Sequence, residues 1–175
     1  MTNAIRILGL DPGLRRTGWG VVSVDGSRLG HLAHGVIAPD ETLSLAERLL
    51  VLFEGVGEVI ARYHPQESAV EETFMTANGA STLKLGHARA AVMLAPAAAG
   101  LPVAEYAAKQ VKKALVGAGG ADKAQVAFMV ARLLPTCGAL TPDASDALAV
   151  AIAHAHARTA QWLERVPRKW ELALR

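Results

Sequence analysis

Apolar residues along the chain form short uninterrupted runs and longer runs at helical spacing. Residues 5–10 are rich in Ile and Leu, which is typical of a strand covered on both faces. Two further apolar runs flank an Asp-Gly turn at 25–28, and Asp-Gly favours tight hairpins. The runs that predict strands are 5–10, 19–24, 29–38, 67–72 and 101–107.

The longer runs predict helices. Apolar residues recur at helical spacing from 44 to 63, and Pro65 follows the end of that run. Asp122 can cap a later helix, and Thr141-Pro142 opens the last one. The predicted helices are 44–63, 79–99, 108–117, 122–134 and 143–166. The order β-β-β-α-β-α-β-α-α-α favours an α/β fold, a mixed five-stranded sheet with helices on both faces.

Length and composition indicate a folded domain with a substantial core, since the 175 residues are 51% apolar and 19% charged. The single cysteine, Cys137, excludes an internal disulfide and a cysteine-based zinc cage. No signal-peptide pattern opens the sequence, and the longest uncharged stretch, 90–104, is too short to span a bilayer. We therefore expect a cytoplasmic protein with one domain at 1–157 and a loosely attached tail at 158–175.

Charge is unevenly distributed, although the net charge is only +2. Residues 1–75 carry six Lys and Arg against ten Asp and Glu, whereas residues 84–132 carry seven against two. A basic middle beside an acidic first half suggests an anionic partner held next to carboxylates. On charge alone, an ordinary solvated surface is the alternative.

Four candidate catalytic carboxylates stand where strands end or a helix begins. Asp11 ends the first apolar run, where an unpaired buried charge is costly. Glu71 and Glu72 end the fourth run, and one of them should face the covered side because side chains alternate along a strand. Asp143 and Asp146 share one face of the last helix. A turn, a loop or a helix cap would also explain these acids, although Asp146 lies past the capping turn.

Acids that converge repel each other unless cations lie among them. Oxygen-only ligands select hard ions such as Mg²⁺ or Mn²⁺, and two ions about 3.5–4 Å apart can stabilise both oxygens of an in-line phosphoryl displacement. Two rival sites are excluded. Trp19 stands where a Walker loop needs lysine, and His154 and His156 face apart on one helix without a zinc motif.

Basic residues in the middle of the chain suit a nucleic-acid backbone. Lys109, Lys112 and Lys113 share a helical face, and Lys123 follows a glycine-rich loop. Lysines in such an arrangement contact phosphate without reading sequence. Phe74 lies in otherwise polar company, where an aromatic ring either stacks between bases or folds back into the core.

Four ordered blocks of the sequence closely resemble the RuvC family of bacterial Holliday junction resolvases: LGLDPGLRRTGWG, AVEETFMTANGASTLKLGHARA, VAEYAAKQVKKALVGAGGADKAQV and DASDALAVAIAHAHA. The likeness runs from about residue 5 to about residue 156. It implies a ribonuclease H-like fold and a homodimer that cuts four-way DNA junctions symmetrically, in recombination and repair. It also implies the RuvA and RuvB branch-migration proteins as partners and a thymine-rich cleavage consensus.

The resemblance assigns roles to single residues. It implies that two Mg²⁺ ions, replaceable by Mn²⁺, are held by Asp11, Glu71, Asp143 and Asp146, although some members carry histidine in place of Asp143. Lys112 and Lys123 would neutralise charge on the phosphate in the transition state. Phe74 would probe the junction. The remaining expected DNA contacts are Arg89, Lys109 and Lys113.

The resemblance also implies a mechanism and an interface. Water activated by one ion would attack phosphorus, and the products would carry 5′-phosphate and 3′-hydroxyl ends. Small residues on the predicted helix 79–99 would form the twofold interface, where close helix approach needs small side chains. These residues are Ala80, Ala88, Ala91 and Ala95.

Two other interpretations stay open at this point. The stretch DPGLRRTG is also similar to the phosphate-binding turn of the actin and sugar-kinase superfamily, but that fold needs two such domains. A non-catalytic nucleic-acid-binding module would bind junctions equally well in EDTA or Mg²⁺ and would never nick them. ATP binding would favour the first alternative, and a junction that is bound but never cut would favour the second.

Overall fold

One mixed sheet of five strands organises the molecule, in the order β3-β2-β1-β4-β5. The strands are β1 (Ile5–Asp11), β2 (Thr17–Asp25), β3 (Arg28–Ile37), β4 (Glu67–Glu71) and β5 (Val103–Tyr106). β1, β2 and β3 are joined antiparallel, whereas β4 lies parallel to both β1 and β5. The computed structural model describes residues 4–72 and 79–158. The predicted order of elements and the mixed five-stranded sheet are confirmed.

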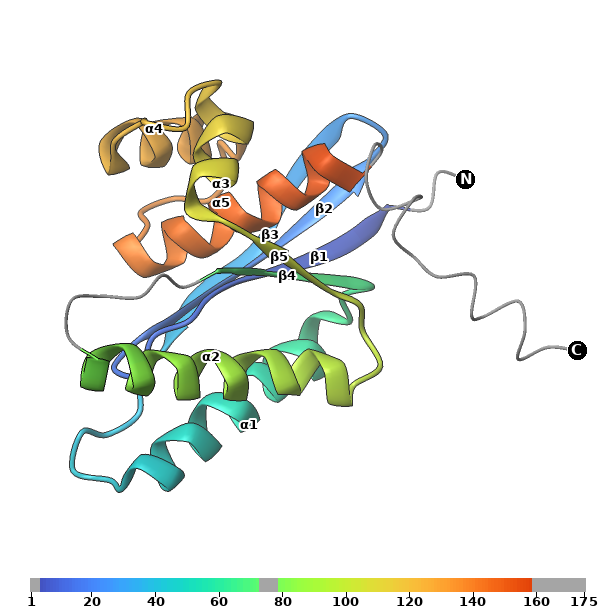
Figure 1. The fold of residues 1–175 in the computed structure, drawn as a ribbon. Coiled ribbons are helices and arrows are strands. Elements are labelled where there is room, and N and C mark those ends of the chain that lie inside the picture. The colour runs from blue at the N-terminus through green and yellow to red at the C-terminus, as the bar shows by residue number, and fades with distance from the viewer. Residues whose placement is uncertain (1–3, 73–78, 159–175) are drawn as a thin grey trace, which may run out of the picture.

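Helices cover both faces of this sheet, as Figure 1 shows. The helices are α1 (Leu45–Tyr63), α2 (Gly79–Ala98), α3 (Ala108–Val116), α4 (Lys123–Leu133) and α5 (Pro142–Ala157). α1 and α2 lie on one face, α5 lies on the other, and α3 and α4 pack on the outside of α5. No helix in the described part of the chain is long and apolar enough to cross a membrane.

The part of β1 from Ile7 to Leu10 carries no polar side chain because its two faces contribute to two cores. Ile7 belongs to the core beneath α5, whereas Leu8 and Leu10 belong to the core beneath α1 and α2, and all three are fully buried. Alternate side chains of a strand point to opposite faces, so a stretch of strand covered on both sides needs apolar residues at every position. Arg6, before this stretch, is exposed, and Asp11, after it, is the point at which β1 leaves the core.

The predicted helix caps are present. Asp122 accepts a hydrogen bond from the backbone N–H of Gln125 at the start of α4, and Thr141 accepts one from Ala144 at the start of α5. Each hydroxyl or carboxylate satisfies a backbone donor that has no partner within its own helix. The first turn of α5 is thus fixed in position, and with it the carboxylates that the turn carries.

Three glycines let α5 lie directly on β1 and β2. A Cβ at Gly9 would collide with the carbonyl of Ala147, and a Cβ at Gly18 would collide with the carbonyl of Asp143. At Gly20 a Cβ would stand 2.5 Å from Leu148 Cδ2. Side chains at these positions would push the helix away from the sheet. The glycines therefore set the height of α5, including its N-terminal turn, above the ends of the two strands.

The C-terminal end of α5 is held by a buried polar cluster. His154 is fully buried, with Nδ1 2.9 Å from the Tyr106 hydroxyl and Nε2 3.0 Å from Glu67 Oε2. Arg158 Nε also donates to Glu67, at 2.9 Å. Burial raises the pKa of Glu67, but the hydrogen bonds from His154 and Arg158 outweigh it and leave that pKa below its usual value. Arg158, the first residue of the expected tail, is thus attached to the domain. The rest of that tail lies outside the described residues.

One prediction about α2 is wrong for three of its four residues. Ala88, Ala91 and Ala95 were expected at an interface between two chains, but all three are buried within this chain, whereas Ala80 is exposed. Ala88 and Ala95 pack in the core that α1 shares with the sheet, where small side chains let the two helices approach closely. The exposed side of α2 carries Leu83 and Leu94 instead, with 62% and 59% of their surface accessible.

Candidate active site

Asp11 and Glu71 end two adjacent parallel strands on the same face of the sheet. Leu10 of β1 pairs with Val70 of β4, so the next residue of each strand brings the two carboxylates side by side. Asp11 has the same parity as Gly9, which faces α5, and Glu71 has the same parity as Ala69, which packs in the core beneath α5. Both acids therefore lie on the α5 side of the sheet.

The structure distinguishes Glu71 from Glu72. Glu71 is half-buried and lines a cavity with Asp11, whereas Glu72 is exposed and its backbone N–H donates to the carbonyl of Tyr106. The sequence could establish only that one of the two faces the covered side. Glu71 is the one that does.

α5 brings a third acid, and α3 and α4 bring two lysines. The cavity has a volume of about 260 Å³. Its polar lining consists of Asp11, Glu71, Lys112, Lys123 and Asp146. Its apolar lining consists of Ala108, Val111, Val126 and Ala149. Five of the residues predicted from the sequence therefore meet in one place, although they come from five different elements.

The electrostatics of this cavity favour added positive charge. Burial, followed by the charges of Glu71, Asp146 and Asp143, raises the pKa of Asp11 to about 7, against the opposing effect of Lys123. Burial and Asp146 likewise raise the pKa of Glu71, although Lys123 and Lys112 oppose the shift. At neutral pH the acids are therefore in a repulsive environment that the two lysines relieve only in part.

The basic residues predicted around the site differ in their surroundings. Lys123 Nζ lies 3.1 Å from Asp146 Oδ2, and this hydrogen bond is the main cause of the raised pKa of Lys123. Lys112 is half-buried at the cavity wall, whereas Lys109 and Lys113 are exposed on α3. Arg89 is ion-paired with Glu105 and its Nε donates to the Glu71 carbonyl at 3.3 Å. Phe74 lies outside the described residues.

Asp143 is close to the cluster but is not part of the cavity lining. Its charge contributes to the raised pKa of Asp11, while its own Oδ2 accepts a hydrogen bond from Arg16 Nε at 2.7 Å. Sequence reasoning missed Arg16. The signal was the Arg15-Arg16 pair a few residues after Asp11, because a cation so close to a carboxylate has a strong electrostatic effect on it.

The donor set fits a hard divalent cation. All four acids offer oxygen, the ligand atom that Mg²⁺ and Mn²⁺ prefer, and the raised pKa of Asp11 reflects a need for positive charge. Within residues 4–72 and 79–158, no three His, Cys, Asp or Glu side chains already stand in an arrangement that could hold an ion. Metal binding would compete with the ion pairs that engage Asp143 and Asp146.

The close contact between β2 and α5 gives a first prediction. We expect Gly18→Ala to lower the free energy of unfolding by about 1–3 kcal/mol, because the new methyl group collides with the Asp143 backbone. Urea denaturation measures this effect. Gly57→Ala is the matched control, since open space surrounds Gly57 in α1 and alanine favours a helix. Equal behaviour of the two variants would contradict the prediction.

Comparisons with known proteins agree on one family. A family model described as crossover junction endodeoxyribonuclease RuvC matches residues 7–154. A crossover junction endodeoxyribonuclease RuvC of Caulobacter sp. (strain K31) is 67% identical over 156 residues, which cover 89% of this chain and 92% of the relative. The protein of the same name from Maricaulis maris is 63% identical, with 91% and 96% covered.

Solved structures agree with the sequence relatives. T. thermophilus RuvC in complex with a Holliday junction substrate superposes with a TM-score of 0.82 at 37% identity, covering 88% of this chain and 94% of that one. The yeast mitochondrial Holliday junction resolvase Ydc2 superposes with a TM-score of 0.65 at 12% identity, covering 89% and 81%, which supports the fold alone.

Proposed function

This chain belongs to the RuvC family of crossover junction endodeoxyribonucleases, and on that basis we propose that Asp11, Glu71, Asp143 and Asp146 are its catalytic, metal-binding acids. The protein is a Holliday junction resolvase, a nuclease that hydrolyses phosphodiester bonds in four-way DNA junctions. One observation carries the assignment of the site. Asp11 is half-buried among three other acids and lines one cavity with two lysines where β1 leaves the core.

We propose that Asp11, Glu71, Asp143 and Asp146 hold Mg²⁺, or Mn²⁺ in its place, as two ions per site. These ions would activate the attacking water and stabilise the leaving 3′ oxygen. Lys123 and Lys112 line the same cavity, and Lys123 is hydrogen-bonded to Asp146. Their ammonium groups would neutralise charge that develops on the phosphate in the transition state. The products would then carry 5′-phosphate and 3′-hydroxyl ends.

The DNA path follows from the positions of the exposed lysines. α3 carries Lys109 and Lys113 outside the cavity, and α4 begins at Lys123 beside the acids. We propose that the backbone of one DNA arm crosses these two helices, with Phe74 and Arg89 as further contacts. Arg89 is held by Glu105 and by the Glu71 carbonyl, so a role in supporting the end of β4 would accompany any contact with DNA.

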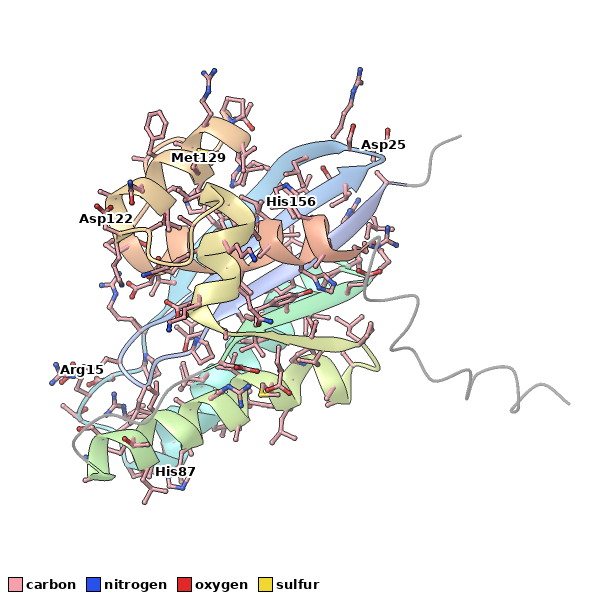
Figure 2. The ribbon with its side chains drawn as sticks, turned by 45° about the horizontal axis from the view of Figure 1, so that its top comes forward. Arg15, Asp25, His87, Asp122, Met129 and His156 are labelled. Atoms are coloured by element: carbon pink, nitrogen blue, oxygen red, sulfur yellow. The ribbon has the colours of Figure 1, made fainter. Side chains whose placement is uncertain are left out.

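The experiment that tests the site uses a labelled four-way junction with Mg²⁺, Mn²⁺ or EDTA. We expect cleavage in either ion and none in EDTA. We expect Asp146→Asn to abolish cleavage while junction binding changes less than about threefold, because the acid acts on the metal rather than on the DNA. Asp25→Asn is the matched control at the far end of the sheet (Figure 2). Cleavage by Asp146→Asn at the wild-type rate would contradict the metal assignment.

We further propose a homodimer in which the exposed side of α2 meets its counterpart. Leu83 and Leu94 are largely exposed there, and His87 lies on the outer side of the same helix (Figure 2). An isologous contact of this kind would present two active sites to two strands of one junction. We expect Leu94→Glu to yield monomers in analytical ultracentrifugation, whereas Leu50→Glu, at a comparably exposed leucine of α1, stays dimeric. A dimeric Leu94→Glu variant would exclude this interface.

Three finer assignments complete the proposal. We propose that residues 1–157 are the nuclease domain and that 158–175 form a separate tail. RuvA and RuvB would deliver the junction to this protein, and the setting would be the cytoplasm. The family membership supports the partners, and the family match over residues 7–154 supports the extent of the nuclease domain.

A further inference from the structure

The turn between β1 and β2 is tightly ordered around one buried hydroxyl group. Thr17 is fully buried, its Oγ1 donates to the Gly13 carbonyl at 2.8 Å, and it accepts from the Gly13 N–H at 3.2 Å. These two hydrogen bonds close the segment from Gly13 to Thr17 into a compact loop. The two arginines of that loop, Arg15 and Arg16, are therefore presented in defined directions.

α1 anchors this loop from the opposite face of the sheet. Arg48 Nη2 donates to the Leu14 carbonyl at 2.9 Å. The Nε of the same guanidinium is buried and makes no hydrogen bond to the described residues. A buried donor without a partner lowers the stability of the fold, and the hydrogen bond from the same guanidinium to Leu14 offsets part of that loss. The turn is thus held by α1 on one face of the sheet, and on the other face its Arg16 contacts Asp143 of α5.

The two arginines of the loop have different partners. Arg15 reaches Glu41 at 3.2 Å, both side chains are largely exposed, and Figure 2 shows Arg15 at the outer end of the loop. Arg16 instead donates to Asp143 Oδ2 at 2.7 Å, a short charge-assisted hydrogen bond to a carboxylate that is only 29% exposed. Exposed ion pairs contribute little to stability. A short hydrogen bond from an ordered loop to a half-buried carboxylate, by contrast, restricts the rotation of that carboxylate.

We propose that Arg16 is a positioning residue for Asp143: it fixes the direction of that carboxylate and offsets its charge beside Asp11. This inference rests on the proposed function, in which Asp143 belongs to the metal-binding acids. The bond engages Oδ2 of Asp143, and the guanidinium charge reduces the repulsion among the acids. Arg16 therefore weakens the attraction of the site for cations while it keeps the acids in a productive arrangement.

This role predicts opposite changes in two measurements when Arg16 is removed. We expect Arg16→Ala to bind Mn²⁺ about 3- to 10-fold more tightly, because a positive charge beside the acids is gone. We expect its single-turnover cleavage rate to fall by about 10- to 100-fold, because Asp143 is free to turn. Arg16→Lys keeps the charge but not the planar donor, so its Mn²⁺ affinity should stay near wild type while the rate is intermediate.

The experiment measures Mn²⁺ affinity by electron paramagnetic resonance of the free protein, and cleavage and junction affinity with labelled DNA. Arg15→Ala is the matched control and should change each quantity by less than about twofold. A fall in both Mn²⁺ affinity and rate would indicate general loosening, and an equal loss of junction affinity and rate would make Arg16 a DNA contact. Either result would overturn the inference, as would an Arg16→Ala variant that matches Arg15→Ala. If the wild type itself neither binds Mn²⁺ nor cleaves, the proposed metal site fails instead.

Discussion

Asparagine in place of Asp11 is expected to abolish junction cleavage and, in buffer without divalent ions, to make the folded protein more stable. Loss of activity combined with a gain in stability is informative, because it is expected where a functional residue is held in an unfavourable environment. Asp11 ends β1 beside Glu71, with Asp146 and Asp143 contributed by α5. A neutral amide of nearly the same shape removes the repulsion among these acids together with the metal ligand.

The pH dependence of this gain follows from the pKa of Asp11. Burial and the neighbouring acids raise that pKa from 3.8 to about 7 in the folded protein. The folded state then binds the proton more tightly than the unfolded chain, so Asp11 destabilises the fold progressively as pH rises from about 4 to 7. At 1.36 kcal/mol for each pKa unit, the full penalty above pH 7 is about 4 kcal/mol, and the amide should recover a few kcal/mol of it.

Urea denaturation in EDTA at pH 4, 6 and 8 measures this effect. The difference in unfolding free energy between Asp11→Asn and wild type should be small at pH 4, grow to pH 7 and then level off. Added Mg²⁺ should stabilise the wild type and leave the variant almost unchanged. Asp25→Asn, at the β2–β3 turn, controls for the loss of one carboxylate elsewhere. An Asp11→Asn protein that is less stable than wild type at pH 8 would show that the acids do not repel each other as described.

A second large effect on the cleavage rate is expected at Glu71, and its neighbour Glu72 serves as the control. We expect Glu71→Gln to lower the cleavage rate by roughly a thousandfold or more, because losing one ligand of a divalent ion removes several kcal/mol of transition-state stabilisation. We expect Glu72→Gln to change it by less than about twofold. Glu71 lines the cavity with Asp11 and Asp146, whereas Glu72 is exposed and its backbone N–H donates to the carbonyl of Tyr106 in β5.

Single-turnover cleavage of a preformed junction complex compares the two variants under saturating protein. Each substitution removes one negative charge, and the two positions are adjacent. A difference in cleavage rate between the variants therefore comes from the direction of the side chain and not from the loss of charge. Junction affinity should stay within about threefold of wild type for both. Equal losses of cleavage rate in the two variants would contradict the prediction, because they would show that the face on which the side chain lies does not matter.

The architecture was predictable because the local signals agree with the tertiary packing. The apolar run from Ile7 to Leu10 in β1 reflects burial on two faces, and the caps at Asp122 and Thr141 satisfy backbone donors of their own helices. Acids at strand ends indicated the site for the same reason, since a charge that ends a buried strand needs a partner. These signals lie within a few residues of the features that they predict.

The details that the sequence left open depend on contacts between distant segments. Arg16 meets Asp143 across 127 positions of the chain, and no local pattern indicates that contact. The alanines of α2 suit either an interface or the core, and the packing of α1 decides for the core. Likewise, alternation along β4 separates Glu71 from Glu72, but only the position of α5 identifies the face that carries the site.

Crystals soaked in Mn²⁺ and measured at the manganese absorption edge test the central assignment most directly. The carboxylates at the C-terminal ends of β1 and β4 and in the N-terminal part of α5 should bind divalent ions between them. We therefore predict anomalous density within coordination distance of Asp11, Glu71 and Asp146. Crystals that show no anomalous density there, with the four acids turned away from one another, would contradict the account.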